Sequence, residues 1–97
     1  MALEAEPDNY GLRLDYGLML EEAGKPREAI EQLRRILPRA GVGDDPAVVF
    51  ALGRAYMKLG DFSNAEEFFR RTLVVNANDR RAQKDLELIQ RSKVGKE

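Results

Sequence analysis

The amino-acid sequence predicts an all-α protein made of two stacked helical hairpins and a closing helix. Apolar residues recur at three- and four-residue steps, the spacing of one face of an α-helix. Glycines and apolar residues also recur at a fixed separation of 36 residues, which indicates an internal repeat. The length of 97 residues suits one domain with a single modest core.

The repeat places glycine on glycine and large apolar residues on large apolar residues. The aligned pairs are Gly17 with Gly53, Gly24 with Gly60, Ala29 with Ala65, Leu33 with Phe69, and Leu37 with Leu73. We expect the small members Gly17, Gly53, Ala29 and Ala65 to lie where two helices cross closely. A larger side chain there would force the helices apart.

The first copy is assigned to residues 10–43 and reads as two helices. Gly24, Lys25 and Pro26 separate them, and proline suits the first turn of a helix because its missing N–H needs no partner there. The apolar stripes expected to face the core are Leu12, Tyr16, Leu20 and Ala23 in the first helix, and Ala29, Leu33, Ile36 and Leu37 in the second.

The second copy is assigned to residues 46–79 and follows the same plan. Asp44, Asp45 and Pro46 are typical of a helix start, and Gly60 followed by Asp61 is typical of a break between helices. The expected core stripes are Val49, Leu52, Tyr56 and Leu59, and then Ala65, Phe69, Thr72 and Leu73.

A closing helix is expected at residues 80–93, with a frayed tail at 94–97. Its apolar residues are Ala82, Leu86, Leu88 and Ile89, and charged residues surround them. One narrow apolar stripe suits the end of a stack, where only one side has a neighbour. Residues 1–9 are interpreted as the tail of a preceding repeat or as an N-terminal arm. We favour an excised piece of a longer array over a complete small protein.

These residues resemble the tetratricopeptide repeat. That family's pattern has a bulky residue, Leu-Gly, Tyr, then Ala and Phe in the second helix, then Pro. The second copy supplies Val49, Leu52-Gly53, Tyr56, Ala65 and Phe69, and has Ala77 at the proline position. The first copy has Arg13 at the bulky position, and its period of 36 exceeds the family's ~34. The resemblance implies a right-handed stack of antiparallel helix pairs, an alpha-alpha superhelix.

The resemblance also implies a concave groove, lined by the first helix of each repeat, that binds a protein or peptide segment. By alignment, the partner-binding groove positions are Leu14, Leu18, Glu21, Phe50, Arg54, Met57, Arg81, Lys84 and Leu88. Four of them, Leu14, Leu18, Phe50 and Met57, lie off the core stripes and are expected to form an exposed apolar patch. An alternative is that they pack against a neighbouring repeat or a dimer partner.

Composition argues against an enzyme. The chain has no histidine and no cysteine, so imidazole catalysis, thiolate chemistry and the usual zinc ligands are missing. Adjacent carboxylates such as Glu21 and Glu22 point about 100° apart on a helix and do not share a site. We therefore expect no catalytic residues, no cofactor and no metal.

Charge and hydropathy limit the partners. The net charge of −1 predicts no nucleic-acid binding, although arginines gather in the sequence at Arg34, Arg35, Arg39, Arg70 and Arg71. No apolar run is long enough for a membrane span. We expect a soluble protein, and the compartment stays open, with the cytoplasm favoured over the periplasm.

Two functions remain open from the sequence. The first is a protein–protein interaction module that binds a partner segment in an apolar, partly basic groove. The second is structural self-assembly, as a homo-oligomer or by stacking of repeat arrays. Residues 1–24 carry a charge of −5 and residues 79–97 carry +2, a polarity that fits stacking of copies head to tail. Binding of chaperone tails is not expected from the resemblance. Family members that bind such tails hold the terminal carboxylate with lysines, asparagines and an arginine, and this chain has Leu14, Leu18 and Ala51 at matching positions.

Overall fold

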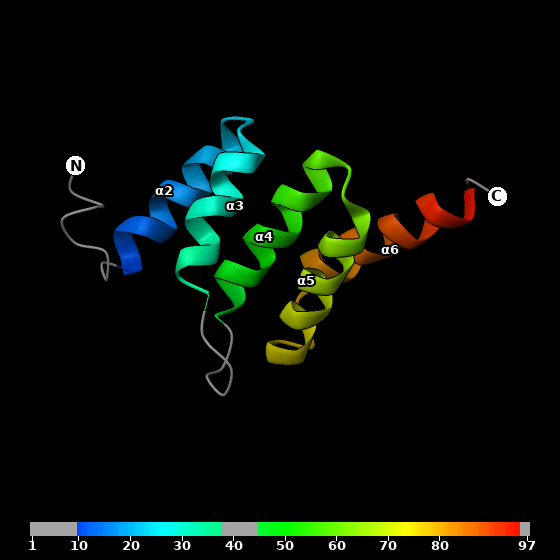
Figure 1. The fold of residues 1–97 in the computed structure, drawn as a ribbon. Coiled ribbons are helices and arrows are strands. Elements are labelled where there is room, and N and C mark those ends of the chain that lie inside the picture. The colour runs from blue at the N-terminus through cyan, green and yellow to red at the C-terminus, as the bar shows by residue number, and fades with distance from the viewer. Residues whose placement is uncertain (1–9, 38–44, 96–97) are drawn as a thin grey trace.

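The structure, a computed structural model, describes residues 10–37 and 45–95, with side chains through residue 92. The described residues form helices and no strands, and the helices are stacked side by side in chain order (Figure 1). They are α2 (Tyr10–Glu22), α3 (Pro26–Arg35), α4 (Pro46–Leu59), α5 (Phe62–Val75) and α6 (Arg80–Gly95). The all-α hairpin stack expected from the sequence is confirmed. The interpretation of residues 1–9 as the tail of a preceding repeat lies outside the described residues.

The two hairpins turn in the same way, at positions 36 residues apart. Gly24 and Gly60 both have φ of +79°, a left-handed conformation that glycine adopts without steric cost. The backbone N–H of Lys25 donates to the carbonyl of Leu20 at 2.9 Å, and that of Asp61 donates to Tyr56 at 3.0 Å. Both hydrogen bonds satisfy carbonyls at a helix C-terminus. The predicted helix breaks are therefore located correctly.

Acidic side chains begin the later helices. The Asp45 carboxylate accepts a hydrogen bond from the Ala47 N–H at 2.8 Å, and Asp61 accepts one from the Asn64 N–H at 3.2 Å. Asp79 accepts from the N–H groups of Arg81 and Ala82 at 3.0 and 3.2 Å. Each carboxylate satisfies N–H groups that the first helical turn leaves without a partner.

Tyr10 and Asp45 join the two hairpins at one edge. The Tyr10 hydroxyl donates a hydrogen bond to the Asp45 carboxylate. Partial burial, together with this carboxylate, raises the pKa of the Tyr10 hydroxyl well above its usual value. The same aspartate therefore begins α4 and contacts the start of α2.

The hydrophobic core runs through the centre of the stack, and α4 contributes most to it. Helix α4 packs against α2, α3 and α5, and its residues from Val48 through Gly53 are all buried. Leu33 and Phe69, the aligned bulky residues of α3 and α5, are fully buried. The expected core stripes of the second copy hold, except that Leu59 and Leu73 are only half-buried.

The expected core stripe of the first helix is wrong for Leu12 and Ala23, while Leu20 is buried and Tyr16 is half-buried against the core. Leu12 is 40% exposed and Ala23 is also exposed, whereas Arg13, Gly17, Leu20 and Glu21 are the buried residues of α2. The cause is position: Leu12 and Ala23 lie on the face of α2 that no helix of the described residues covers. Arg13 donates a hydrogen bond to the Gln32 side chain at 2.7 Å, so a polar contact replaces the bulky apolar one.

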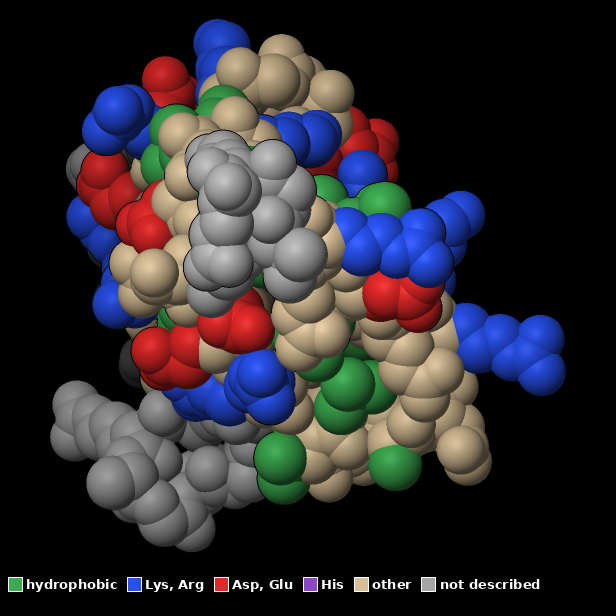
Figure 2. All heavy atoms as spheres, turned by 90° about the vertical axis from the view of Figure 1, so that its right-hand side faces the viewer, with side chains coloured by type: hydrophobic (Ala, Val, Ile, Leu, Met, Phe, Trp, Pro, Cys, Tyr) green, Lys and Arg blue, Asp and Glu red, His purple; other side chains and the backbone are tan. Residues whose placement is uncertain are grey.

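Helix α6 closes the other end of the stack and packs mainly against α5. It covers the core with Ala82 and Ile89, while Leu86 is half-buried and Leu88 is 43% exposed. Its C-terminal half extends past α5 (Figure 1), and the helix continues to Gly95 rather than ending at residue 93. Charged side chains project around this end, with only small hydrophobic areas between them (Figure 2).

Candidate partner-binding groove

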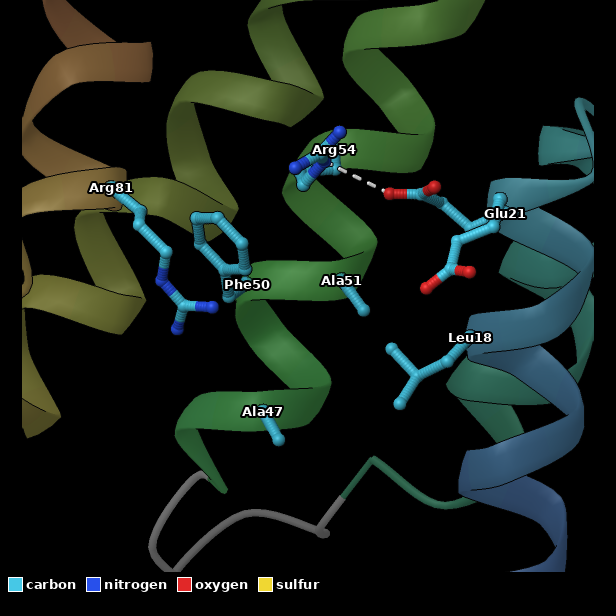
Figure 3. A pocket seen from close by; sticks show the side chains of 8 residues that line it. Leu18, Glu21, Ala47, Phe50, Ala51, Arg54 and Arg81 are labelled. Atoms are coloured by element: carbon cyan, nitrogen blue, oxygen red, sulfur yellow. Dashed lines mark ion pairs between the residues drawn. The ribbon is translucent and has the colours of Figure 1, made fainter.

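A groove of about 540 Å³ opens between α2 and α4 and reaches the first turn of α6. Figure 3 shows how α2 and α4 face each other across it. Its lining residues are Leu18, Glu21, Glu22, Ala47, Phe50, Ala51, Arg54 and Arg81. The larger part of the lining comes from the first helix of each hairpin, as the sequence predicts.

The floor of the groove is recessed because the short side chains of two alanines occupy this face of α4. Ala47 and Ala51 lie one turn apart, and both side chains point toward α2 (Figure 3). Leu18 faces them from α2 and is half-buried. A methyl group in place of a longer side chain leaves room for an apolar group from another molecule.

A smaller hollow of about 270 Å³ lies further along α4, lined by Arg54, Met57, Lys58 and Asp85. Arg54 lines both hollows. The two hollows therefore meet at Arg54 on the same face of α4.

Glu21 is a buried carboxylate that binds two cations of α4. Its side chain is 6% exposed, and its two oxygens contact Arg54 Nε at 2.9 Å and Lys58 Nζ at 2.8 Å. Lys58 Nζ also donates to the Glu21 backbone carbonyl at 2.8 Å. Because a buried carboxylate needs partners that replace water, these contacts fix the position of α2 against α4 and orient the Arg54 guanidinium.

Arg81 lies over the ring of Phe50 at the far wall. Its guanidinium carbon is 4.2 Å from the centroid of the Phe50 ring, within the range of a cation–π contact. Arg81 Nη2 also contacts Asp79 at 3.4 Å, yet the Arg81 side chain remains 69% exposed. The guanidinium therefore has two contacts within the protein while most of the side chain remains accessible to solvent.

Two aspartates near this wall have shifted pKa values. Burial alone would raise the pKa of Asp79, but hydrogen bonds from the Ala82 N–H and from Arg81 outweigh it and lower the pKa. Burial raises the pKa of Asp85, although Arg54, Lys84 and Arg81 oppose that shift. Asp85 is half-buried beside Arg54, and the nearby cations offset only part of the cost of burying its charge.

The structure brings five of the nine predicted groove residues together in the larger hollow. These are Leu18, Glu21, Phe50, Arg54 and Arg81. Met57 lines the smaller hollow, while Leu14, Lys84 and Leu88 line neither of these two. Whether any of the nine contacts a partner stays a prediction.

The expectation of an exposed apolar patch is wrong. Phe50 is 7% exposed and belongs to the core, where its ring centroid lies 5.7 Å from that of Phe69. Leu14, Leu18 and Met57 are half-buried and pack against the same core. Phe50 is covered from two sides, by Phe69 of α5 and by Arg81 at the start of α6.

The nine predicted groove positions do not include five residues that also line the two hollows: Glu22, Ala47, Ala51, Lys58 and Asp85. A signal for Ala47 exists in the sequence. It lies one turn before Ala51, and two small residues at that spacing produce a depression in a helix surface. Lys58 and Asp85 carry no comparable signal, because charged residues are common on all the helices of the described residues.

Residues 10–37 and 45–95 contain no group of three or more acidic, histidine or cysteine side chains that could hold a metal ion. None of the helices in those ranges combines the length and the hydropathy that crossing a membrane requires.

Comparison with protein families identifies the fold. The model of the tetratricopeptide repeat family matches residues 2–46 and, in a second overlapping match, residues 20–85. The chain therefore belongs to the tetratricopeptide repeat family. Repeats of this family generally mediate protein–protein interactions, and the family is typically non-enzymatic. A search of curated proteins gave no match to the chain.

Proposed function

We propose that the chain binds a segment of a partner protein in the groove between α2 and α4. The observation that carries this proposal is the hollow over Ala47 and Ala51, which faces Leu18 and is bordered by Arg54 and Arg81. Binding sites for segments of other molecules are typically concave, with an apolar floor and a few well-placed polar groups. This groove has both properties.

The site is also rigidly supported, which favours binding. Glu21 ties α2 to α4, and Arg81 is held over Phe50, so both walls have a defined geometry before a partner arrives. A preformed surface loses less conformational entropy on binding than a flexible one.

A peptide selection tests the proposal. Random peptides displayed on phage are selected for binding to the wild-type chain. The affinity of the selected peptides, labelled with a fluorophore, is measured by fluorescence anisotropy. Ala47→Trp should abolish binding, because the indole would fill the hollow. Ala47 is solvent-exposed, so the helical circular dichroism signal should stay unchanged.

Ala77→Trp is the matched control, since Ala77 is an exposed alanine outside the groove. It should bind the selected peptides like the wild type. If the peptides bind Ala47→Trp as tightly as the wild type, the partner is bound on another surface and the proposal is wrong.

A second candidate function, self-assembly, is favoured by the uncovered face of α2. Leu12, Met19 and Ala23 lie seven and four residues apart on that face, and Leu12 and Met19 are 40% and 59% exposed. Another helix, from a second copy or from an adjacent repeat, would bury this stripe.

Light scattering at two protein concentrations separates the two functions. A mass that increases with concentration, and that returns to the monomer value in Met19→Glu, would support self-assembly. A constant monomer mass would exclude a homo-oligomer through this face.

A further inference from the structure

The uncovered face of α2 is apolar and acidic. Leu12 and Met19 are its large exposed apolar side chains, and Asp15 lies beside both, three residues after the first and four before the second. Glu22 is exposed at the edge of this face, toward the groove. The other two charged side chains of α2 are buried. The surface that α2 supplies here therefore presents two negative charges and no positive one.

The outward face of α6 is basic around one apolar side chain. Ala82 and Ile89 of this helix are buried in the core, so the opposite side of the helix faces solvent. The exposed residues on that side are Arg80, Lys84, Glu87, Leu88 and Arg91. Three bases against one acid leave two positive charges in excess, and Lys and Arg side chains project from this end of the stack (Figure 2).

The two faces carry the same residue spacing with opposite charge. In each face an apolar residue follows one charged residue by four positions and precedes another by three. The acidic triplet of α2 is Asp15, Met19 and Glu22, and the basic triplet of α6 is Lys84, Leu88 and Arg91. Each triplet covers two turns on one side of its helix, so its charged members lie about 10 Å apart along the axis. Two such helices side by side can bring the apolar residues together and pair both sets of charges.

We propose that copies of the chain assemble head to tail, with the acidic triplet of one copy packed on the basic triplet of the next. This inference rests on self-assembly, the second candidate function, and it names the surface that covers α2. Met19 and Leu88, 59% and 43% exposed in the single chain, bury each other in this arrangement. The 2.7 Å contact of Arg91 with Glu87 joins two exposed side chains, so little free energy opposes its rearrangement.

Charge decides between this arrangement and a symmetric one. Two α2 faces packed together would place two carboxylates from each copy in one interface, and two α6 faces would bring their excess bases together. Like charges disfavour both pairings. The faces that attract each other lie at opposite ends of the stack (Figure 1). A contact between unlike faces does not close after two copies, so each added copy offers a new face and the mass continues to increase with concentration.

Charge reversal tests the pairing of the two faces. Asp15→Lys with Glu22→Lys makes the α2 face basic, and Lys84→Glu with Arg91→Glu makes the α6 face acidic. Either pair of changes leaves like charges at the contact, so association should require a concentration about tenfold higher than in the wild type. The chain with all four changes has opposite charges at the contact again and keeps the wild-type net charge of −1, so it should associate like the wild type. Sedimentation velocity over a concentration series measures the mass, and circular dichroism shows whether each variant is helical.

Glu31→Lys with Glu67→Lys is the matched control. These glutamates are 62% and 61% exposed on α3 and α5, outside both triplets, and their reversal changes the net charge by as much as the α2 pair does. The control should associate like the wild type.

The outcomes separate this inference from the function beneath it. A wild-type chain that stays monomeric at every concentration would overturn self-assembly and the inference together. Association that is unchanged by the α6 reversal would keep self-assembly and overturn the head-to-tail contact, because α6 would then lie outside the interface. Loss of association in a helical chain with all four changes would also overturn it, because the charges would not pair as proposed.

Discussion

Gly53 of α4 lies against the ring of Phe69 of α5, so close that a β-carbon at Gly53 would be 2.7 Å from two ring carbons. Gly17 of α2 has the same relationship to Leu33 of α3, with a β-carbon 2.7 Å from Cδ2. The second pair follows the first by 36 residues in the sequence, so each repeat contains the same helix crossing. Backbone and large side chain meet directly at each one.

Gly53→Ala should destabilise the protein, although alanine is the better helix former. The added methyl group forces the Phe69 ring to move, and overpacking of this kind costs about 1–3 kcal/mol. Gly11→Ala is the matched control, because no atom lies within 4 Å of the position of its β-carbon. It should raise stability by less than the ~0.5–1 kcal/mol expected in the middle of a helix, because Gly11 is the second residue of α2. Urea unfolding followed by circular dichroism measures both. Equal effects of the two changes would contradict the close crossing.

Ile89→Ala should destabilise far more than Leu88→Ala, its neighbour on α6. Ile89 is 1% exposed and Leu88 is 43% exposed, so only the first change leaves a cavity against α5. A buried isoleucine replaced by alanine costs about 2–5 kcal/mol, a large share of a small domain's stability. Thermal melting of both variants gives the comparison. If Ile89→Ala melts like the wild type, α6 does not contribute to the folded core.

Glu21→Gln should loosen α2 from α4. The change removes the charge that holds Arg54 and Lys58, and both cations are partly exposed and can rehydrate, so we expect a loss of about 1–3 kcal/mol. Glu87→Gln is the control, because Glu87 and Arg91 are 60% and 74% exposed and such a pair contributes about 0.3–0.5 kcal/mol. Denaturant titration gives both free energies of unfolding. Equal losses would show that Glu21 acts as an ordinary surface charge.

Asp79 and Asp85 should give the stability opposite dependences on pH. The pKa of Asp79 is lower in the folded chain than its usual 3.8, so its stabilising contribution is present above that pH and is lost as the pH falls. The pKa of Asp85 is raised above 3.8, so the folded state binds its proton more tightly and stability falls as the pH rises through that interval.

The aspartate variants test these signs separately. Asp85→Asn should raise the melting temperature at pH 7, and Asp79→Asn should reduce the loss of stability between pH 5 and pH 3. Thermal melts from pH 3 to pH 7, at constant ionic strength, measure both effects. A lower melting temperature of Asp85→Asn at pH 7 would show that the Asp85 charge is stabilising.

The sequence predicted the parts of the fold that depend on neighbours within a repeat. Gly17, Gly53, Ala29 and Ala65 are buried at helix crossings as expected, and the turns at Gly24 and Gly60 have the left-handed conformation that favours glycine. Such features are set by local geometry, so residue type and spacing are enough to locate them.

The errors concern contacts beyond the repeat. The pattern of α2 matches that of α4, yet Leu12 and Ala23 are exposed because no described helix precedes α2. Phe50 occupies a groove position by alignment, and it is buried because Phe69 of α5 and Arg81 at the start of α6 cover it from two sides. Residue periodicity shows which face of a helix is apolar, but it does not show which neighbour covers that face.

The position of the groove, across the joint between the two hairpins, links binding to folding. The main contacts connect helices adjacent in the chain, so the protein should fold and open in units, with α4 and α5 as the most persistent pair. Separation of α2 and α3 from that pair removes one wall of the groove and leaves the other intact. A ligand that contacts both Leu18 and Ala51 therefore opposes the separation of α2 and α3 from α4 and α5. It should slow amide hydrogen exchange throughout α2 and α3, including at amides that it does not contact.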